Sequence, residues 1–187
     1  METGPATRIA VDVTFLEMTE RPTGERPCLP PGWSVRKIAS PGVALYRDLY
    51  GTVGHDYCWW LRQTLADADL AALLALPEIG LYVLYDDDRI AGFFELDERI
   101  RGSVNLAYFG LMPSAIGRGV GRAFLAAAVD AAWSSAPVVV RVNTCTADHP
   151  RALGTYCAAG FRIVRVVREL WDIPDRLGLP IPDRLRA

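Results

Sequence analysis

The sequence is poor in residues that bind metals or form disulfide bonds. It has only two histidines and four cysteines in 187 residues. Structural zinc sites need four ligands at short, regular spacings. The cysteines are isolated from one another and form no CxxC pair (Cys28, Cys58, Cys145 and Cys157). The sequence therefore predicts no metal site, and unpaired cysteines are typical of a reducing compartment such as the cytoplasm.

Long hydrophobic runs and an excess of positive charge are also missing. No uncharged apolar stretch reaches the roughly 18–20 residues that span a bilayer. The N-terminus does not show the basic segment followed by an apolar segment that is typical of a signal peptide. The net charge is −2, whereas general nucleic-acid-binding proteins are usually basic. We therefore expect a cytoplasmic protein that binds neither a membrane nor nucleic acid.

The chain does contain enough apolar residues for one folded domain. Its hydrophobic content is 51%, and its length suits a single domain with a sizeable core. We expect a flexible N-terminus over residues 1–7, one domain over 8–172 and a proline-rich tail over 173–187. Apolar residues of the tail could dock on a partner subunit or over the site (Leu177, Leu179, Ile181 and Leu185). A monomer and a homodimer both fit these observations.

Hydrophobic periodicity predicts the order of the elements. Apolar runs predict strands over residues 9–18, 33–38, 81–85, 90–96, 105–112, 138–144 and 161–169. Helical patterns cover 43–50, 57–65, 67–77, 119–134 and 150–160, and Gly51 to Asp56 is expected to interrupt the first two as a glycine-hinged loop. This order predicts an α/β or α+β fold with at least one parallel βαβ unit from Asn105 to Thr144.

The most informative segment is the glycine-rich turn Gly117-Arg118-Gly119-Val120-Gly121, which follows an apolar strand and precedes an Ala/Leu-rich helix. Such a turn directs several unpaired backbone N–H groups at one small volume, and the helix dipole adds partial positive charge. Glycines let a bulky anion approach the main chain. The segment therefore predicts a pyrophosphate-binding site.

A dinucleotide-binding Rossmann unit is one alternative for this turn. Its glycine spacing differs from GxGxxG, however, and Val138–Val140 is followed by Arg141 rather than by an acidic residue. Both features argue against that motif.

The element order and two motifs resemble the GNAT family of acyl-CoA-dependent N-acetyltransferases. The family's Gln/Arg-x-x-Gly-x-Gly/Ala turn matches at Gly119-Val120-Gly121, although Ile116 stands at the Gln/Arg position. The family's Asn-x-x-Ala-x-x-Leu-Tyr-x-x-x-Gly-Phe segment also matches in part, with His149 and Thr155 in place of Asn and Leu. The matching positions of this second motif are Ala152, Tyr156, Gly160 and Phe161.

This resemblance implies a mixed, mostly antiparallel central sheet flanked by helices, with acetyl-CoA as the cofactor. The strand at Phe109, Gly110 and Leu111 should diverge from residues 138–144, so that the pantetheine arm pairs with its backbone. The remaining residues expected to bind the cofactor are Gly117, Arg118, Gly119, Val120, Gly121, Arg122 and His149.

Acetyl transfer to an amine needs a neutral amine, a stabilised carbonyl oxygen and a proton for the departing thiolate. The resemblance places Tyr156 near the sulfur as the proton donor, although a core tyrosine is the alternative. A backbone N–H group near Leu111 is the candidate for stabilising the oxygen.

Glu95 is the candidate general base, because its apolar neighbours should raise the pKa of a carboxyl group. A solvated or ion-paired strand carboxylate is the alternative role for Glu95. Asp97, His55 and His149 are rival bases, and His149 also suits a helix cap.

Aromatic side chains gather between residues 46 and 60 and predict the wall of an acceptor pocket. The expected substrate-binding residues are Tyr46, Tyr50, His55, Trp59 and Trp60, and packing in the core is the alternative for each aromatic. We therefore expect an N-acetyltransferase that acts on a primary amine, and we favour a small molecule as the acceptor. One alternative is an N-acetyltransferase with a protein or peptide acceptor. The other is a non-catalytic protein of the same fold that binds acyl-CoA as a sensor.

Overall fold

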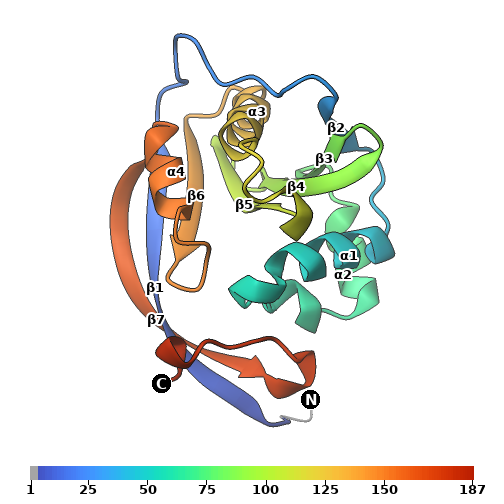
Figure 1. Cartoon of the computed structure of the whole chain (residues 1–187), viewed down its shortest axis with the longest axis vertical. Coiled ribbons are helices and arrows are strands. Elements are labelled where there is room, and N and C mark those ends of the chain that lie inside the picture. The colour runs from blue at the N-terminus through green and yellow to red at the C-terminus, as the bar shows by residue number, and fades with distance from the viewer. Residues whose placement is uncertain (1–3) are drawn as a thin grey trace.

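The computed structural model describes residues 4–187 and contains a seven-stranded sheet with helices on both faces (Figure 1). The strands are β1 (Ala6–Met18), β2 (Trp33–Ile38), β3 (Ile79–Asp86), β4 (Arg89–Asp97), β5 (Ser103–Leu111), β6 (Val139–Cys145) and β7 (Arg162–Pro174). The helices are α1 (Val43–Gly54), α2 (Asp67–Leu74), α3 (Gly121–Trp133) and α4 (Ala152–Ala158). The expected flexible N-terminus lies partly outside the described residues, and β1 already begins at Ala6.

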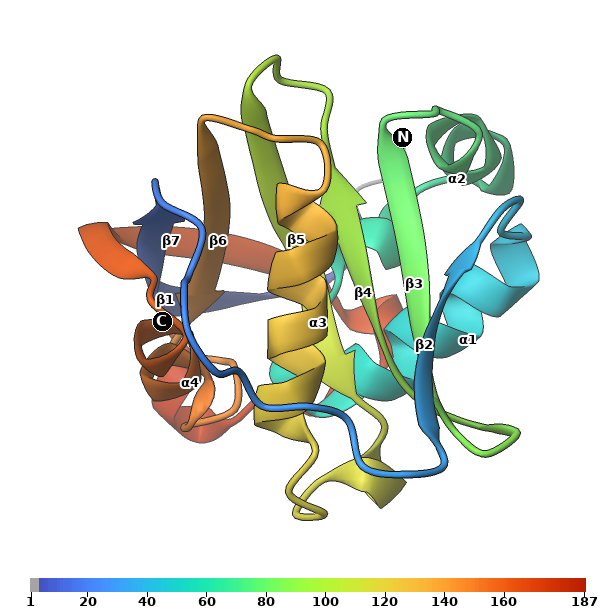
Figure 2. The same ribbon diagram turned by 90° about the horizontal axis from the view of Figure 1, so that it is seen from above.

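The strands follow the order β2-β3-β4-β5-β6-β1-β7. Every neighbouring pair is antiparallel except β5 and β6, which are parallel and are connected through α3. The predicted α/β class, the mostly antiparallel sheet and the parallel βαβ unit are therefore confirmed. Figure 2 shows α3 crossing one face of the sheet, with α1 and α2 on the opposite side.

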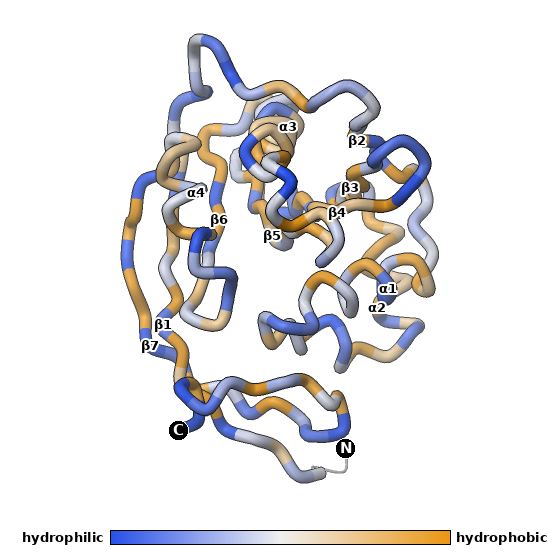
Figure 3. Tube along the Cα trace, in the orientation of Figure 1, coloured by the Kyte–Doolittle hydropathy of each residue, from blue (hydrophilic) through white to orange (hydrophobic). Residues whose placement is uncertain are grey.

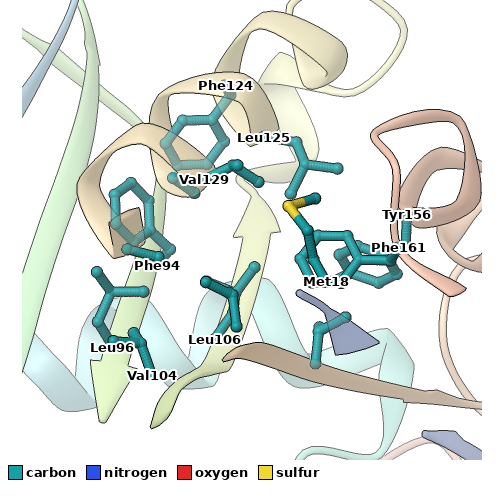
Figure 4. Close-up of a cluster of buried hydrophobic side chains, with 14 of the residues drawn as sticks. Met18, Phe94, Leu96, Val104, Leu106, Phe124, Leu125, Val129, Tyr156 and Phe161 are labelled. Carbon is teal, nitrogen blue, oxygen red and sulfur yellow. The ribbon is translucent and has the colours of Figure 1, made fainter. Parts of the chain in front are cut away.

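Strand β4 explains why both faces of the sheet are covered. Its side chains alternate, so that Phe93 packs into a cluster with α1 and α2, whereas Phe94 packs into a cluster with α3. The second cluster also receives Tyr156 and Phe161, which approach Met18 beneath α3 (Figure 4). No helix among residues 4–187 is long and apolar enough to cross a bilayer.

The C-terminal segment packs against the far ends of β1 and β7, at the bottom of Figure 1. Leu185 is buried beside Ile9 and Ile173. Three further apolar residues of this segment pack against the same cluster (Leu177, Leu179 and Ile181). In Figure 3, apolar and polar sections alternate along the trace of this part of the chain. The tail thus completes a third hydrophobic cluster of the same chain.

Three sequence-based assignments are wrong. Helix α1 continues through Gly51 to Gly54, because Leu49, Tyr50 and Val53 bury one face of it against the sheet and this packing outweighs the low helix propensity of glycine. The stretch expected to resume as a helix forms only two short 3₁₀ turns, over residues 55–57 and 61–64. Strand β7 also continues to Pro174, inside the expected tail.

Candidate active site

The two parallel strands diverge at the centre of the sheet. β5 and β6 pair only from Ser103↔Val139 to Leu106↔Val142. Beyond Leu106, β5 remains beside β4, and β6 remains beside β1. A cavity of about 1490 Å³ fills this opening and reaches from the glycine-rich turn to the aromatic segment after α1. The predicted divergence of Phe109–Leu111 from β6 is therefore confirmed.

The glycine-rich turn forms one end of the cavity. Gly117 and Gly119 have φ angles of 84° and 78°, a left-handed conformation that side chains rarely adopt, and no atom lies within 4 Å of a Cβ placed on either residue. Both residues line the cavity together with Gly121, the first residue of α3, and Arg122. The open backbone and the helix N-terminus suit a phosphate-bearing ligand.

Two residues of the expected cofactor site point elsewhere. Arg118 forms an ion pair with Asp86, and its guanidinium lies 4.7 Å from the centroid of the Trp33 ring. Val120 is buried in the core beneath α3. In the turn region, Arg122 lines the cavity and Arg118 does not. A second cation, Arg151, lines the cavity from the segment just before α4.

Strand β5 supplies the wall of the opening through Phe109, Gly110 and Leu111. Phe109 is held by stacking on Phe124 of α3, with ring centroids 4.8 Å apart. Gly110 has a different role, because a Cβ there would lie 2.3 Å from Cγ1 of Val53. Its missing side chain allows α1 to pack closely on β5.

Tyr156 lines the cavity from α4. The side chain is only 7% exposed and packs edge-on against Phe109 and Phe161, with centroid distances of 6.3 and 6.0 Å. Within residues 4–187 its hydroxyl has no hydrogen-bond partner, although the residue lines the cavity. Burial, followed by the charge of Asp148, raises the pKa of Tyr156 above its usual value. The phenol therefore stays protonated and can donate a hydrogen bond to a ligand.

Glu95 is held in a buried ion pair on the α1 side of the sheet. Its exposure is 0%, and its Oε1 accepts a hydrogen bond from Nη2 of Arg62 at 2.7 Å. Its Oε2 accepts a hydrogen bond from the hydroxyl of Tyr46, which also accepts from Nε of Arg62 at 3.2 Å. Glu95 and Tyr46 do not line the cavity. Of the two roles considered for Glu95, general base or ion-paired strand carboxylate, the structure contains the ion pair.

Arg62 connects this pair to the cavity, which it lines with a side chain that is 17% exposed. Burial, the largest single influence, disfavours its charged form, but the charge and hydrogen bond of Glu95 together with Tyr46 and Tyr108 outweigh it and raise the pKa of Arg62. Its guanidinium lies 5.3 Å from the centroid of the Tyr108 ring. Arg62 and Tyr108 were missed at the sequence level because neither belongs to a recognisable motif.

The aromatic segment forms the opposite wall. Tyr50, Trp59 and Tyr108 pack around one another, with centroid distances between 4.9 and 5.3 Å. These three residues and Trp60 line the cavity. The expected substrate-binding residue His55 is exposed and lies outside the cavity lining.

A carboxylate missed at the sequence level, Asp148, lines the cavity three residues after the end of β6. Its Oδ2 accepts hydrogen bonds from Oγ1 of Thr144 at 2.8 Å and from the backbone N–H of Cys145 at 2.9 Å. Its Oδ1 accepts a hydrogen bond from Nε1 of Trp59 at 3.4 Å. Asp148 lines the cavity and forms no salt bridge within residues 4–187. The available sequence signal was an acidic residue three positions after the end of a buried strand.

The rival bases are placed less favourably. Asp97 lines the cavity, but its hydrogen bond with Arg99 lowers the pKa of its carboxyl group. His149 lines the cavity, and its Nδ1 accepts a hydrogen bond from the backbone N–H of Arg151, in the turn just before α4, at 3.1 Å.

A pair of glycines in α1 tests how tightly the aromatic wall is packed. A Cβ on Gly54 would lie 2.3 Å from Cβ of Trp59, so Gly54→Ala should lower the free energy of unfolding by about 1–3 kcal/mol. Gly51 has no atom within 4 Å of its Cβ position, so Gly51→Ala should be neutral or stabilise the helix by about 0.5–1 kcal/mol. Urea denaturation of both variants checks this; equal effects would contradict the packing described here.

The acetyltransferase (GNAT) family profile matches residues 44–161, which include α1, β3 to β6, the glycine-rich turn and α4. The chain belongs to the GNAT acetyltransferase family. No curated protein matches it.

Solved structures agree with this GNAT fold. A GCN5-related N-acetyltransferase from Sphaerobacter thermophilus is similar over 90% of this chain and 54% of its own length, with a TM-score of 0.58 and 19% identity. A tandem GNAT protein of the clavulanic acid biosynthesis pathway is similar over 92% of this chain and 61% of its own, with a TM-score of 0.62 and 14% identity. An aminoglycoside acetyltransferase from an uncultured soil metagenomic sample is similar over 69% of this chain and 88% of its own length, with a TM-score of 0.56 and 13% identity. The chain thus spans little more than half the length of the first two.

Proposed function

We propose that this GNAT protein is an N-acetyltransferase that transfers an acetyl group from acetyl-CoA to a primary amine of a small molecule. The observation that carries the proposal is the continuity of one cavity of about 1490 Å³. It joins an open glycine-rich turn at one end to an aromatic chamber with a carboxylate at the other. The similarity in fold to an aminoglycoside acetyltransferase supports a small-molecule acceptor.

The residues present fit acetyl-CoA, whose thioester supplies the acetyl group. The backbone of residues 117–122 and the guanidinium of Arg122 would bind the pyrophosphate. The free edge of β5 at Phe109–Leu111 would pair with the pantetheine amides, as an added strand does. Ile116 is 43% exposed at the position of the expected polar side chain, so the backbone and Arg122 must supply most of the anion binding.

Tyr156 is proposed as the proton donor to the departing sulfur. Its hydroxyl is protonated and faces the cavity without a partner in the described chain. A backbone N–H group near Leu111 would stabilise the carbonyl oxygen as negative charge develops there.

Asp148 is proposed as the group that orients the attacking amine and accepts its proton, directly or through water. It lies in the cavity, is close enough to Tyr156 to affect its pKa, and is fixed by three hydrogen bonds. Glu95 is better suited to hold Arg62 in place than to accept a proton, because both of its oxygens are engaged away from the cavity.

A thiol-release assay with acetyl-CoA and a panel of amines, amino acids, aminoglycosides and peptides tests this function. We expect release that depends on a small amine, and a loss of about 100-fold or more in kcat/KM for Asp148→Asn. Asp97→Asn is the matched control within the same cavity and should have a much smaller effect. Acetyl-CoA binding without thiol release over the whole panel would instead favour the non-catalytic sensor, and release only with peptides would favour a protein acceptor.

A further inference from the structure

The cavity also extends over one face of β6, β1 and β7, away from the glycine-rich turn. The strand register places the lining residues of this extension on one face, because Phe15 pairs with Asn143 and Val13 with Cys145. On the next strand, Val11 pairs with Glu169 and Ile9 with Trp171. Phe15, Val13, Asn143, Cys145, Glu169 and Trp171 all line the cavity, and Trp60 lines it from the 3₁₀ segment after α1.

Glu169 lies in this extension without a cationic partner. Its Oε2 accepts a hydrogen bond from Nε1 of Trp171 at 2.7 Å, and it forms no salt bridge within residues 4–187. Arg165 is on the same face of β7, but four residues of extended strand separate it from Glu169 by about 13 Å. The Arg165 guanidinium is instead placed 4.3 Å from the centroid of the Phe15 ring.

The corner around Glu169 is rigidly supported. Trp60 and Trp171 pack against the same buried cluster, which contains Ile9 and Cys58, and the C-terminal segment packs on that cluster as well. The hydrogen bond from Trp171 holds its indole beside the Glu169 carboxylate. Two indoles and an unpaired carboxylate in a cavity are the chemistry that binds an organic cation.

We propose that Glu169, Trp171 and Trp60 form a second subsite of the acceptor cavity, which binds a distal ammonium group of a linear diamine or polyamine. This inference rests on the proposed function, since the other amine would react beside Asp148 and Tyr156. A neutral group at this corner would remove water from an unpaired carboxylate without replacing its interactions, whereas an ammonium group pairs with it. The subsite therefore selects acceptors with a second positive charge.

The test compares cadaverine with hexylamine, in which a methyl group replaces the second ammonium. We expect the wild-type protein to prefer cadaverine by about tenfold or more in kcat/KM for thiol release. Glu169→Gln keeps an oxygen that can accept the Trp171 hydrogen bond and removes only the charge, so it should bring this preference close to one. Asp172→Asn is the matched control: Asp172 is the exposed partner of Arg8, lies outside the cavity lining, and its variant should keep the preference.

Calorimetric titration of the two amines into the protein saturated with CoA separates the subsite from the transfer reaction. Preferential binding of cadaverine that Glu169→Gln loses and Asp172→Asn keeps would support the subsite, even if neither amine were acetylated and the proposed function had failed. Equal affinity for the two amines in the wild type would overturn the subsite, even if both were acetylated. The same effect of Glu169→Gln and Asp172→Asn would also overturn it.

Discussion

Replacement of Tyr156 by phenylalanine is expected to lower kcat for acetyl transfer about 100-fold or more, with little change in KM for acetyl-CoA. The substitution keeps the ring that packs against Phe109 and Phe161, and it removes only a hydroxyl that has no partner among the described residues. The loss should therefore affect the departing thiolate and leave both cofactor binding and stability almost unchanged.

Steady-state kinetics and thermal unfolding of Tyr156→Phe measure these two effects separately. Tyr82→Phe is the control, since Tyr82 stacks on Phe94 and lies outside the cavity lining. Because burial raises the pKa of Tyr156, its deprotonation begins only above the ordinary range for a tyrosine, and it should cause no alkaline decline in rate near neutral pH. A kcat within a few-fold of the wild type would leave Tyr156 as a core residue only.

Arg62→Ala is expected to lower the free energy of unfolding by about 3–5 kcal/mol, the cost of leaving a buried charge without its partner. Glu95 is fully buried, and the only cation among its hydrogen-bond partners in the described chain is Arg62. The hydroxyl of Tyr46 cannot replace the guanidinium, because burial and the charge of Glu95 raise its pKa and keep it a neutral donor.

Arg62→Ala is measured by urea denaturation beside Arg99→Ala. The latter removes an arginine that is 49% exposed from its pair with Asp97, and it should cost at most about 1 kcal/mol. The double variant Arg62→Ala/Glu95→Gln should recover part of the lost stability, since it removes the unpaired charge. Equal costs for the two arginines would show that the buried pair does not stabilise the fold in this way.

The sequence predicted the features that depend on local pattern. Alternating apolar residues identified the strands, and the glycines before α3 identified a turn whose positive φ angles at Gly117 and Gly119 the structure contains. The parallel βαβ unit followed from the order of the elements and their connection lengths. These features require no knowledge of which residues meet in space.

Long-range partners could not be predicted in the same way. The ion pair of Glu95 joins positions 62 and 95, and Asp148 meets Trp59 only because β6 ends beside the segment after α1. Arg118 appeared to be a phosphate ligand because of its place in the turn, but the β3–β4 hairpin brings Asp86 to it. The helix through Gly51 likewise depends on burial against the sheet, which local propensity does not reveal.

A calorimetric titration of acetyl-CoA into the wild-type protein, with Gly119→Val and NAD titrated in parallel, tests the proposed site most directly. For the proposed cofactor site we expect saturable one-site binding of acetyl-CoA, competition by free CoA and no binding of NAD. Gly119→Val should weaken binding strongly, because valine disfavours the positive φ angle and closes the backbone approach at the turn. Binding of NAD without binding of acetyl-CoA, or the same affinity for acetyl-CoA in Gly119→Val, would contradict the proposed cofactor site.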